Sequence, residues 1–493
     1  MRPASVAPPP ETAGQPAHRA SSPSWRHRLA GAPWLGPTLL MTALAAWQLG
    51  RPALWADELA TVNAAVLPWD GLRQLLGQVD LVMAPYYTVM HIWTAIFGTS
   101  EIAVRLPSAL AGIATVAVTA QLGARLWDRR AGVIAGVLLA VLPAFSRYAQ
   151  EARAYSLAVF ALTLATLLLV RWIERPGALR LVAYAVVLGV GVLLGPFGAM
   201  ILAAHAVLAW RGRFPWSWAI SAAGAVLPGM ALFAMSALTQ RDQTSWIRRL
   251  TLEGANGVVE RGLTVAGPVA VTAALIVLGL LAVRKKQPVL AMACWSFLPI
   301  VLLLAAGLVT PVWVARYVFF TLPGFALLAA SWLRQVSLAR STAVVVAVAL
   351  FGAGSNIAIR RPAGHGQDSR RIAAIIGPRF QAGDVVIYGD NHPSIPWSPR
   401  DVVARYLPAG KTPRDVLMIS PQRADGHLLA VECGDVSACV GDAARIWVVR
   451  ADNPADPRTG LDGGKSPFLA EHYSVNHVWR YPLLTVALLD RTH

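Results

Sequence analysis

Two adjacent carboxylates, Asp57 and Glu58, follow the first long apolar run of the chain by a few residues. Charged groups at the edge of a membrane segment are costly unless water or a function keeps them there. A carboxylate in such a place can act as a general base that takes the proton from an attacking hydroxyl group. We therefore take Asp57 as the candidate base and Glu58 as a neighbour that orients it or binds a metal ion.

The local sequence also allows a purely structural role for this acidic pair. Asp57 is a suitable N-cap for the helix expected through Leu59 to Val66, and Glu58 suits its first turn. Capping does not exclude catalysis, so both roles remain open.

Further polar side chains that could complete a site occur in the first outer loop, in the run RYAQEARAY and at the end of TPVWVARY. Arginine binds phosphate oxygens well through its planar fork, and can hold a phosphate that departs with negative charge. A single phosphate ester can be held by arginines alone, so no cofactor is required, although a divalent metal is also compatible. These candidate substrate-binding residues are Asp80, Arg147, Glu151, Arg153, Tyr155, Arg316 and Tyr317.

The arginines have an ordinary alternative role as anchors of span ends among lipid headgroups. The excess of basic residues is expected on the cytoplasmic side, which makes the outer pair Arg147 and Arg153, on either side of Glu151, less expected as anchors. Both roles stay open for Arg316 and Tyr317 as well.

The composition is that of a polytopic α-helical membrane protein, with 56% hydrophobic residues, 14% charged residues and a mean hydropathy of +0.51. The formal net charge of +17 lies largely in short loops between apolar runs, where it sets membrane orientation and meets anionic lipid headgroups. That distribution excludes nucleic acid as a partner.

Eleven apolar runs reach membrane-spanning length or approach it. They lie at about 34–50, 104–122, 131–146, 156–170, 181–195, 197–210, 217–238, 262–282, 288–308, 317–333 and 341–357.

The segment 84–98 is apolar but short, and we interpret it as a helix in the outer interface. This choice places five basic clusters in the cytoplasm, as the positive-inside rule requires. The clusters are Arg125/Arg129/Arg130, Arg171/Arg175/Arg180, Arg211/Arg213, Arg284/Lys285/Lys286 and Arg334/Arg340.

The domain organisation follows from this topology. Residues 1–32 are a Pro/Ala/Ser-rich tail that we expect to be disordered and cytoplasmic, and 33–359 form the transmembrane domain with a first outer loop at 51–103. Residues 360–493 carry short β-branched runs between turns and predict a small extracytoplasmic α/β domain. The protein is thus expected in the cell membrane as a multi-pass protein.

Two of the three cysteines fall in the C-terminal domain. Cys433 and Cys439 are separated by five residues, and an oxidising location outside the membrane makes a local disulfide plausible. Cys294 lies within a predicted span and is expected to be packing.

Several segments together resemble the membrane-embedded GT-C glycosyltransferases, in particular the bacterial glycosyltransferase family 39-like mannosyltransferases and their protein O-mannosyltransferase relatives. They are the acidic pair, YYTVMHIW, AVRLPSALAG, RYAQEARAYSL and ARYVFFTLPGFALLAA, and the resemblance covers about 34–357. It implies an inverting transferase with the catalytic acidic residue at Asp57 and phosphate-binding positions near Arg147, Glu151 and Arg153. Many relatives have a His-Pro-Pro-Leu stretch where this chain has Val82-Met83-Ala84-Pro85, so Asp80 is the candidate second polar group.

The function expected from these residues is transfer of a sugar from a polyprenyl-phosphate donor to an acceptor hydroxyl on the outer face of the membrane. The resemblance implies mannose as the sugar, and the acceptor can be a glycan, a lipid or a protein. The alternative is a transporter or flippase of lipid-linked glycans, but the charges gather at one membrane face and no repeat is evident, unlike in typical transporters.

Overall fold

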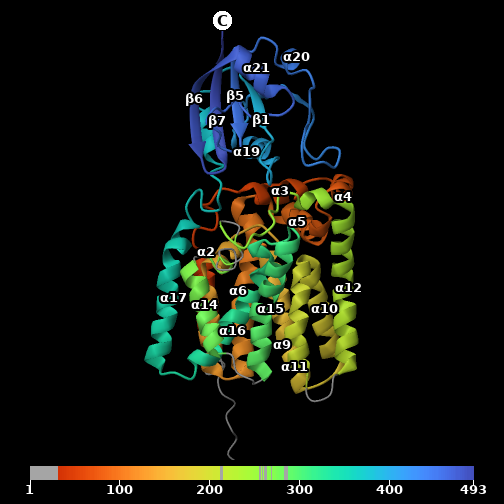
Figure 1. Cartoon of the computed structure of the whole chain (residues 1–493), viewed down its shortest axis with the longest axis vertical. Coiled ribbons are helices and arrows are strands. Elements are labelled where there is room, and N and C mark those ends of the chain that lie inside the picture. The colour runs from red at the N-terminus through yellow and green to blue at the C-terminus, as the bar shows by residue number, and fades with distance from the viewer. Residues whose placement is uncertain are drawn as a thin grey trace, which may run out of the picture.

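The computed structural model describes residues 32–210, 215–254, 257, 259, 264–267, 269–282 and 287–492. A bundle of long helices is capped at one end by a small sheet domain (Figure 1). The predictions for the tail up to residue 31, for Arg211/Arg213 and for Arg284/Lys285/Lys286 lie outside the described residues, as does the start of the span expected at 262–282.

The helices of the bundle coincide with the predicted spans. In chain order they are α2 (Leu35–Ala46), α6 (Glu101–Leu126), α7 (Arg129–Val141) with α8 (Pro143–Ala149), α9 (Tyr155–Glu174), α10 (Ala178–Leu194), η2 (Pro196–Ile201) with α11 (Leu202–Ala209), α12 (Trp216–Thr239), α14 (Val269–Ala282), α15 (Gln287–Val309), η4 (Ala315–Thr321) with α16 (Leu322–Leu333), and α17 (Leu338–Ala358).

Among the described residues, six helical segments are long and apolar enough to cross a membrane, and the bent pair α7–α8 can count as a seventh. The bend of 70° in that pair lies just before Pro143, whose ring cannot continue the preceding helix. The other predicted spans coincide with apolar helices of 10–17 residues. The protein is therefore a multi-pass membrane protein, and the number of eleven spans stays a prediction.

Basic residues from several loops gather at the end of the bundle that lies away from the sheet domain (Figure 1). At the C-terminal end of α6, Arg125 pairs with Glu174, and Arg334 pairs nearby with Asp128, so basic clusters from three loops meet there. Arg105 lies 20 residues earlier in the same helix, about 30 Å away at 1.5 Å per residue. That separation equals the thickness of the hydrocarbon core of a bilayer.

A layer of short helices separates the bundle from the sheet domain (Figure 1). It consists of α3 (Ala56–Ala65), α4 (Trp69–Gln78), the 3-10 turn η1 (Leu81–Met83) and α5 (Ala84–Phe97). The segment predicted to be an interfacial helix is α5, and its Trp93 donates to the carbonyl of Ala103 at the start of α6.

The C-terminal domain is built on a five-stranded sheet in the order β2-β1-β5-β7-β6. Strand β1 runs parallel to β2 and β5, whereas β7 is antiparallel to both β5 and β6. The strands are β1 (Val385–Gly389), β2 (Arg414–Asp415), β5 (Arg445–Arg450), β6 (Tyr473–Tyr481) and β7 (Leu484–Arg491), and β3 (Met418–Ser420) pairs with β4 (Val431–Glu432) in a separate ladder. The helices are α18 (Arg371–Ile376), α19 (Ser398–Tyr406), α20 (Val436–Val440) and α21 (Lys465–His472).

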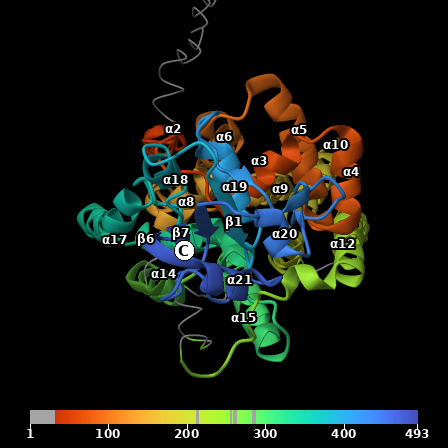
Figure 2. The same ribbon diagram turned by 90° about the horizontal axis from the view of Figure 1, so that it is seen from above.

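The sheet domain is packed firmly onto the layer of short helices. One buried apolar cluster includes Leu59 of α3, Tyr87 of α5, Val402 of α19 and Trp447 of β5. Figure 2 shows the domain above the middle of the bundle, with α19 close to α3. The domain is thus part of the architecture around the first loop and is not a loosely tethered module.

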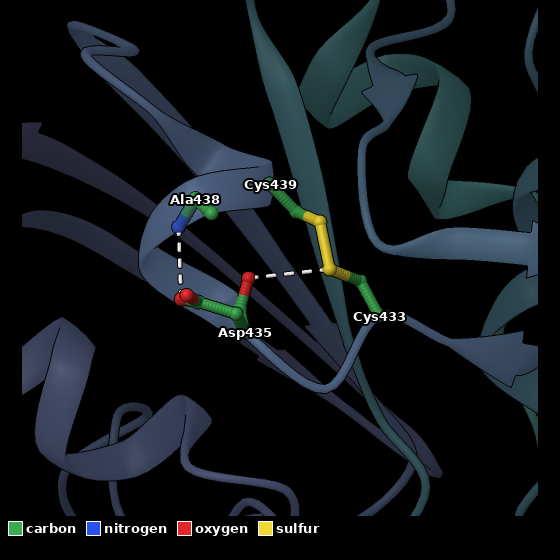
Figure 3. Close-up of a disulfide and its surroundings, with 4 residues drawn as sticks. All are labelled: Cys433, Asp435, Ala438 and Cys439. Atoms are coloured by element: carbon green, nitrogen blue, oxygen red, sulfur yellow. Dashed lines mark hydrogen bonds between the residues drawn. A yellow bond between two sulfur atoms is a disulfide. The ribbon is translucent and has the colours of Figure 1, made fainter.

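A disulfide joins Cys433, which precedes the short helix α20, to Cys439 within that helix (Figure 3). Asp435 caps this helix by accepting from the backbone N–H of Ala438 at 3.0 Å. The bridge lies within the sheet domain, and both of its cysteines pack against the buried apolar cluster of that domain.

Candidate active site

The acidic pair lies in the first turn of α3, in the layer between the bundle and the sheet domain. Glu58 accepts a hydrogen bond of 3.5 Å from the backbone N–H of Trp55, which precedes the helix. Acidic side chains in a first turn stabilise the helix by accepting from free N–H groups. The helix begins at Ala56 with Trp55 as its N-cap, so the N-cap role expected for Asp57 is wrong, and both carboxylates lie inside the first turn. This placement does not explain why the two carboxylates face different partners.

Asp57 is nearly buried and lies between two arginines. Its Oδ2 is 3.6 Å from Nη1 of Arg316 and 4.0 Å from Nε of Arg153, with 11% of its side chain exposed. That oxygen has no hydrogen-bond partner, and neither has the Nε atom of either arginine. Buried polar atoms are normally hydrogen-bonded, so three such atoms around one point indicate a place for a further polar group.

Glu58 is fully buried in a bidentate pair with Arg105 of α6. The Nε–Oε1 distance is 2.7 Å and the Nη2–Oε2 distance is 2.6 Å. Burial alone would raise the pKa of Glu58, but the charge and hydrogen bonds of Arg105 more than offset this, so the pKa lies below its usual range. Glu58 also accepts from the backbone N–H of Ala152 at 2.9 Å, which ties α3 to the loop before α9.

The last turn of α8 and the loop that leads to α9 bring Arg147, Glu151 and Arg153 to the same place. Glu151 accepts from Arg147 at 2.5 Å and from the indole N–H of Trp55 at 3.0 Å. Burial raises the pKa of Glu151, Arg147 opposes the shift, and the neighbouring Glu58 adds to it. Arg153 donates weakly to the backbone carbonyl of Asp57 at 3.4 Å.

Asp80 lies near Arg153, whose charge acts on its carboxylate. It adopts a left-handed backbone conformation with φ of 56° and accepts from the hydroxyl of Tyr87 at 2.9 Å. Burial raises the pKa of Asp80, and the Arg153 charge opposes the shift. Asp80 is therefore next to the candidate site, with one carboxylate oxygen held by α5.

The two predicted tyrosines lie on the side of Arg316. Tyr317 stacks on Phe197 with ring centroids 4.9 Å apart, and Tyr155 at the start of α9 packs edge-on against Tyr148 at 5.2 Å. The guanidinium of Arg316 also lies over the ring of Trp246, at 5.3 Å. The structure thus brings every predicted site residue into one neighbourhood.

Two residues of this neighbourhood were not predicted from the sequence, Arg105 and His365. Arg105 could have been noticed, because a charge within the apolar helix AVRLPSALAG demands a partner. His365 lies in the linker between α17 and the sheet domain, and its Nδ1 is 3.3 Å from Oε2 of Glu58. Its position next to the first loop depends on the tertiary fold alone.

Among the described residues, no group of three or more His, Cys, Asp or Glu side chains is arranged to hold a metal ion. Whether a divalent metal takes part with the substrate therefore stays a prediction. The arginines supply the positive charge that this site contains.

Known proteins resemble this chain in sequence over part of its length and in fold over most of it. Residues 82–235 match the family described as dolichyl-phosphate-mannose-protein mannosyltransferase. None of the curated proteins matches the chain in sequence.

Solved structures share the fold at low sequence identity. The apo structure of ArnT from Cupriavidus metallidurans superimposes with a TM-score of 0.61 at 13% identity, covering 93% of this chain and 98% of that one. Its structure bound to undecaprenyl phosphate gives 0.59 at 14% identity, covering 92% and 97%. The Archaeoglobus fulgidus oligosaccharyltransferase tethered to an acceptor peptide gives 0.50 at 10% identity, covering 94% and 74%.

The sequence match and the fold match support one conclusion. The helical bundle with its C-terminal sheet domain has the GT-C architecture, and the resemblance inferred from the sequence is confirmed. Both similarities favour an enzyme over the transporter alternative. The chain is similar to the family 39-like GT-C glycosyltransferases in sequence over residues 82–235, and in fold over most of its length.

Proposed function

We propose that the protein transfers a sugar from a polyprenyl-phosphate donor to an acceptor hydroxyl at the extracytoplasmic face of the membrane. The observation that carries this proposal is the group of unpartnered polar atoms around Asp57, with Arg153 and Arg316 on either side. A donor phosphate between the two arginines would give each Nε a partner. The solved ArnT structure with undecaprenyl phosphate supports a donor of this chemical class.

Asp57 serves as the base in this proposal. Its free Oδ2 can accept the proton of the acceptor hydroxyl as the oxygen attacks the anomeric carbon. The bond from that carbon to the phosphate oxygen breaks at the same time, and the arginines hold the departing phosphate. Attack from the side opposite the phosphate inverts the anomeric configuration.

The remaining groups position the reactants. Glu58 orients α3, because its carboxylate is fully engaged by Arg105 and backbone N–H groups and so is less suited to bind a metal. Glu151 fixes Arg147 near the phosphate site. Tyr155, Tyr317 and Asp80 lie near Asp57 and would contact the sugar or the acceptor, and mannose is the sugar named in the description of the matching family.

The decisive experiment compares the wild type with Asp57→Asn, using a labelled polyprenyl-phosphate mannose and a membrane extract as acceptor. Loss of a general base typically costs about 10²–10⁴-fold in rate, so we expect kcat to fall by that factor. Asp70→Asn is the matched control, because its carboxylate on α4 lies in the same layer and is 97% exposed.

Full activity of Asp57→Asn would refute the base assignment. Absence of transfer by the wild type from any polyprenyl-phosphate sugar would refute the donor class. Equal losses in Asp57→Asn and Asp70→Asn would show that the change acts on stability or insertion and not on the reaction.

A further inference from the structure

The linker that follows α17 reaches back to the acidic pair of the first loop. Arg360 donates to the carbonyl of Leu44 and to Ser146, and Ser369 donates to the carbonyl of Leu54 at 2.8 Å. Between these two anchors, the carbonyl of Pro362 accepts from the N–H of Ala53 at 2.9 Å. The linker is therefore fixed at its start against α2 and α8, and farther along against the segment that leads into α3.

Two glycines make a narrow turn around His365. A Cβ on Gly364 would lie 2.2 Å from the carbonyl oxygen of Ile359, and Gly366 has φ of +95°. A side chain at 364 would clash, and one at 366 would strain the backbone. The sequence Gly364-His365-Gly366 thus allows the linker to approach closely and place one imidazole inside the protein, where it is 3% exposed.

The hydrogen bonds of Arg105 and Glu58 around this imidazole indicate which of its nitrogens carries the proton. The five N–H groups of Arg105 already serve Glu58 and three backbone carbonyls of the turn at 49–53. Arg105 has no further proton for Nδ1 of His365, whereas Oε2 of Glu58 can accept one at 3.3 Å. The neutral ring therefore carries its proton on Nδ1.

Neutrality follows from the surroundings of the ring. Burial, and next the nearby Arg147 charge, lower the pKa of His365 to about 3. The side chain therefore acts as a constant hydrogen-bond donor at neutral pH.

We propose that His365 is a positioning residue for the transfer reaction: by donating to Glu58, it fixes the first turn of α3 and thereby the carboxylate of Asp57. This inference rests on the proposed role of Asp57 as the base. Glu58 directly follows Asp57 in that turn, so the contacts of one carboxylate set the backbone that carries the other. The linker of the extracytoplasmic domain is then part of the active site.

The test measures kcat, donor KM and thermal stability for the full-length wild type, His365→Leu and His365→Asn. The asparagine amide can take the place of the Nδ1 donor, whereas leucine fills the volume without a donor. A misplacement of about 1 Å costs on the order of 10²-fold in rate, so we expect a loss of that order in His365→Leu, with donor KM little changed. We expect His365→Asn to recover most of the rate.

His427→Leu is the matched control, because this histidine is exposed in the same domain. Wild-type kcat in His365→Leu would overturn the proposal, and so would equal losses in the leucine and asparagine variants. If His365→Leu does not fold, His365→Gln replaces it, because its amide lies too far along the side chain to reach Glu58 in the same way. Equal rates in the asparagine and glutamine variants would then overturn the proposal.

The two proposals fail in different ways. An inactive wild type refutes the proposed donor, and a wild type that is active while Asp57→Asn is equally active refutes the base. A dependence on Asp57 without a dependence on His365 refutes the positioning role alone.

Discussion

The buried pair of Glu58 and Arg105 makes a quantitative prediction possible. Both side chains are 0% exposed, and the Arg105→Met substitution keeps an unbranched apolar stem while it removes the guanidinium and its charge. Glu58 would lose both of its guanidinium donors, and three backbone carbonyls of the turn at 49–53 would lose theirs. An uncompensated buried charge costs about 3–5 kcal/mol, and the lost carbonyl contacts place Arg105→Met at the upper end of that range.

The double variant Glu58→Gln/Arg105→Met tests whether the lone charge is the cause. Glutamine keeps an acceptor for the N–H of Ala152, but it carries no charge that needs a partner. We therefore expect the double variant to be more stable than Arg105→Met, with an interaction energy between the two sites of about 1–3 kcal/mol.

The assay is equilibrium unfolding by SDS in detergent micelles, followed by tryptophan fluorescence. Arg125→Met is the control, because Arg125 lies on the same helix and its pair with Glu174 is 39% and 42% exposed. An exposed pair contributes at most about 1 kcal/mol, so this change should be nearly neutral. Equal effects of Arg105→Met and Arg125→Met, or a double variant no more stable than Arg105→Met, would refute the reasoning.

Two further predictions follow from the same site. Arg153→Ala and Arg316→Ala each remove a charged hydrogen-bond donor, and a hydrogen bond to a charged group contributes about 1.5–3 kcal/mol. We therefore expect kcat/KM for the donor to fall about 10–100-fold while KM for the acceptor changes little, with the exposed Arg73→Ala as the control. Equal losses for donor and acceptor would point to structural damage instead. The pKa of Glu58 is lower in the folded protein than in the unfolded chain, where it is about 4.3, so its ionised carboxylate stabilises the folded state at pH values above about 4.3. This stabilisation is lost as the pH falls from that value towards the pKa of the folded state. Unfolding measured against pH should therefore show a steeper acid loss for the wild type than for Glu58→Gln, and parallel curves would contradict this assignment.

Much of the architecture could be predicted from the sequence because membrane insertion imposes simple local rules. Apolar runs of about 15–22 residues, basic loops and β-branched runs after residue 360 correspond to the bundle and the sheet domain. The short segment at 84–98 is α5, in the layer where an interfacial helix was expected. The length of a run does not decide whether it crosses the membrane, so the number of spans could not be fixed in this way.

The sequence was enough to predict which residues form the candidate site, but not which partners each of them contacts. The acidic pair and the arginines at 147, 153 and 316 are polar residues at span ends, and that placement marks them in the sequence. The structure assigns their partners, and it separates two adjacent carboxylates: Asp57 faces Arg153 and Arg316, whereas Glu58 faces Arg105. Helical geometry explains this difference, since successive residues point about 100° apart around the axis.

Hydropathy and charge act locally along the chain, and they sufficed to predict a multi-pass membrane protein with a carboxylate pair and several arginines at span ends. Only the folded arrangement shows that Arg105 neutralises Glu58 and that Asp57 keeps a free oxygen between two arginines. It also shows that His365 reaches the first loop from a linker about 300 residues away. Such contacts join segments remote in the chain, and their energies depend on burial and distance, which no local pattern records.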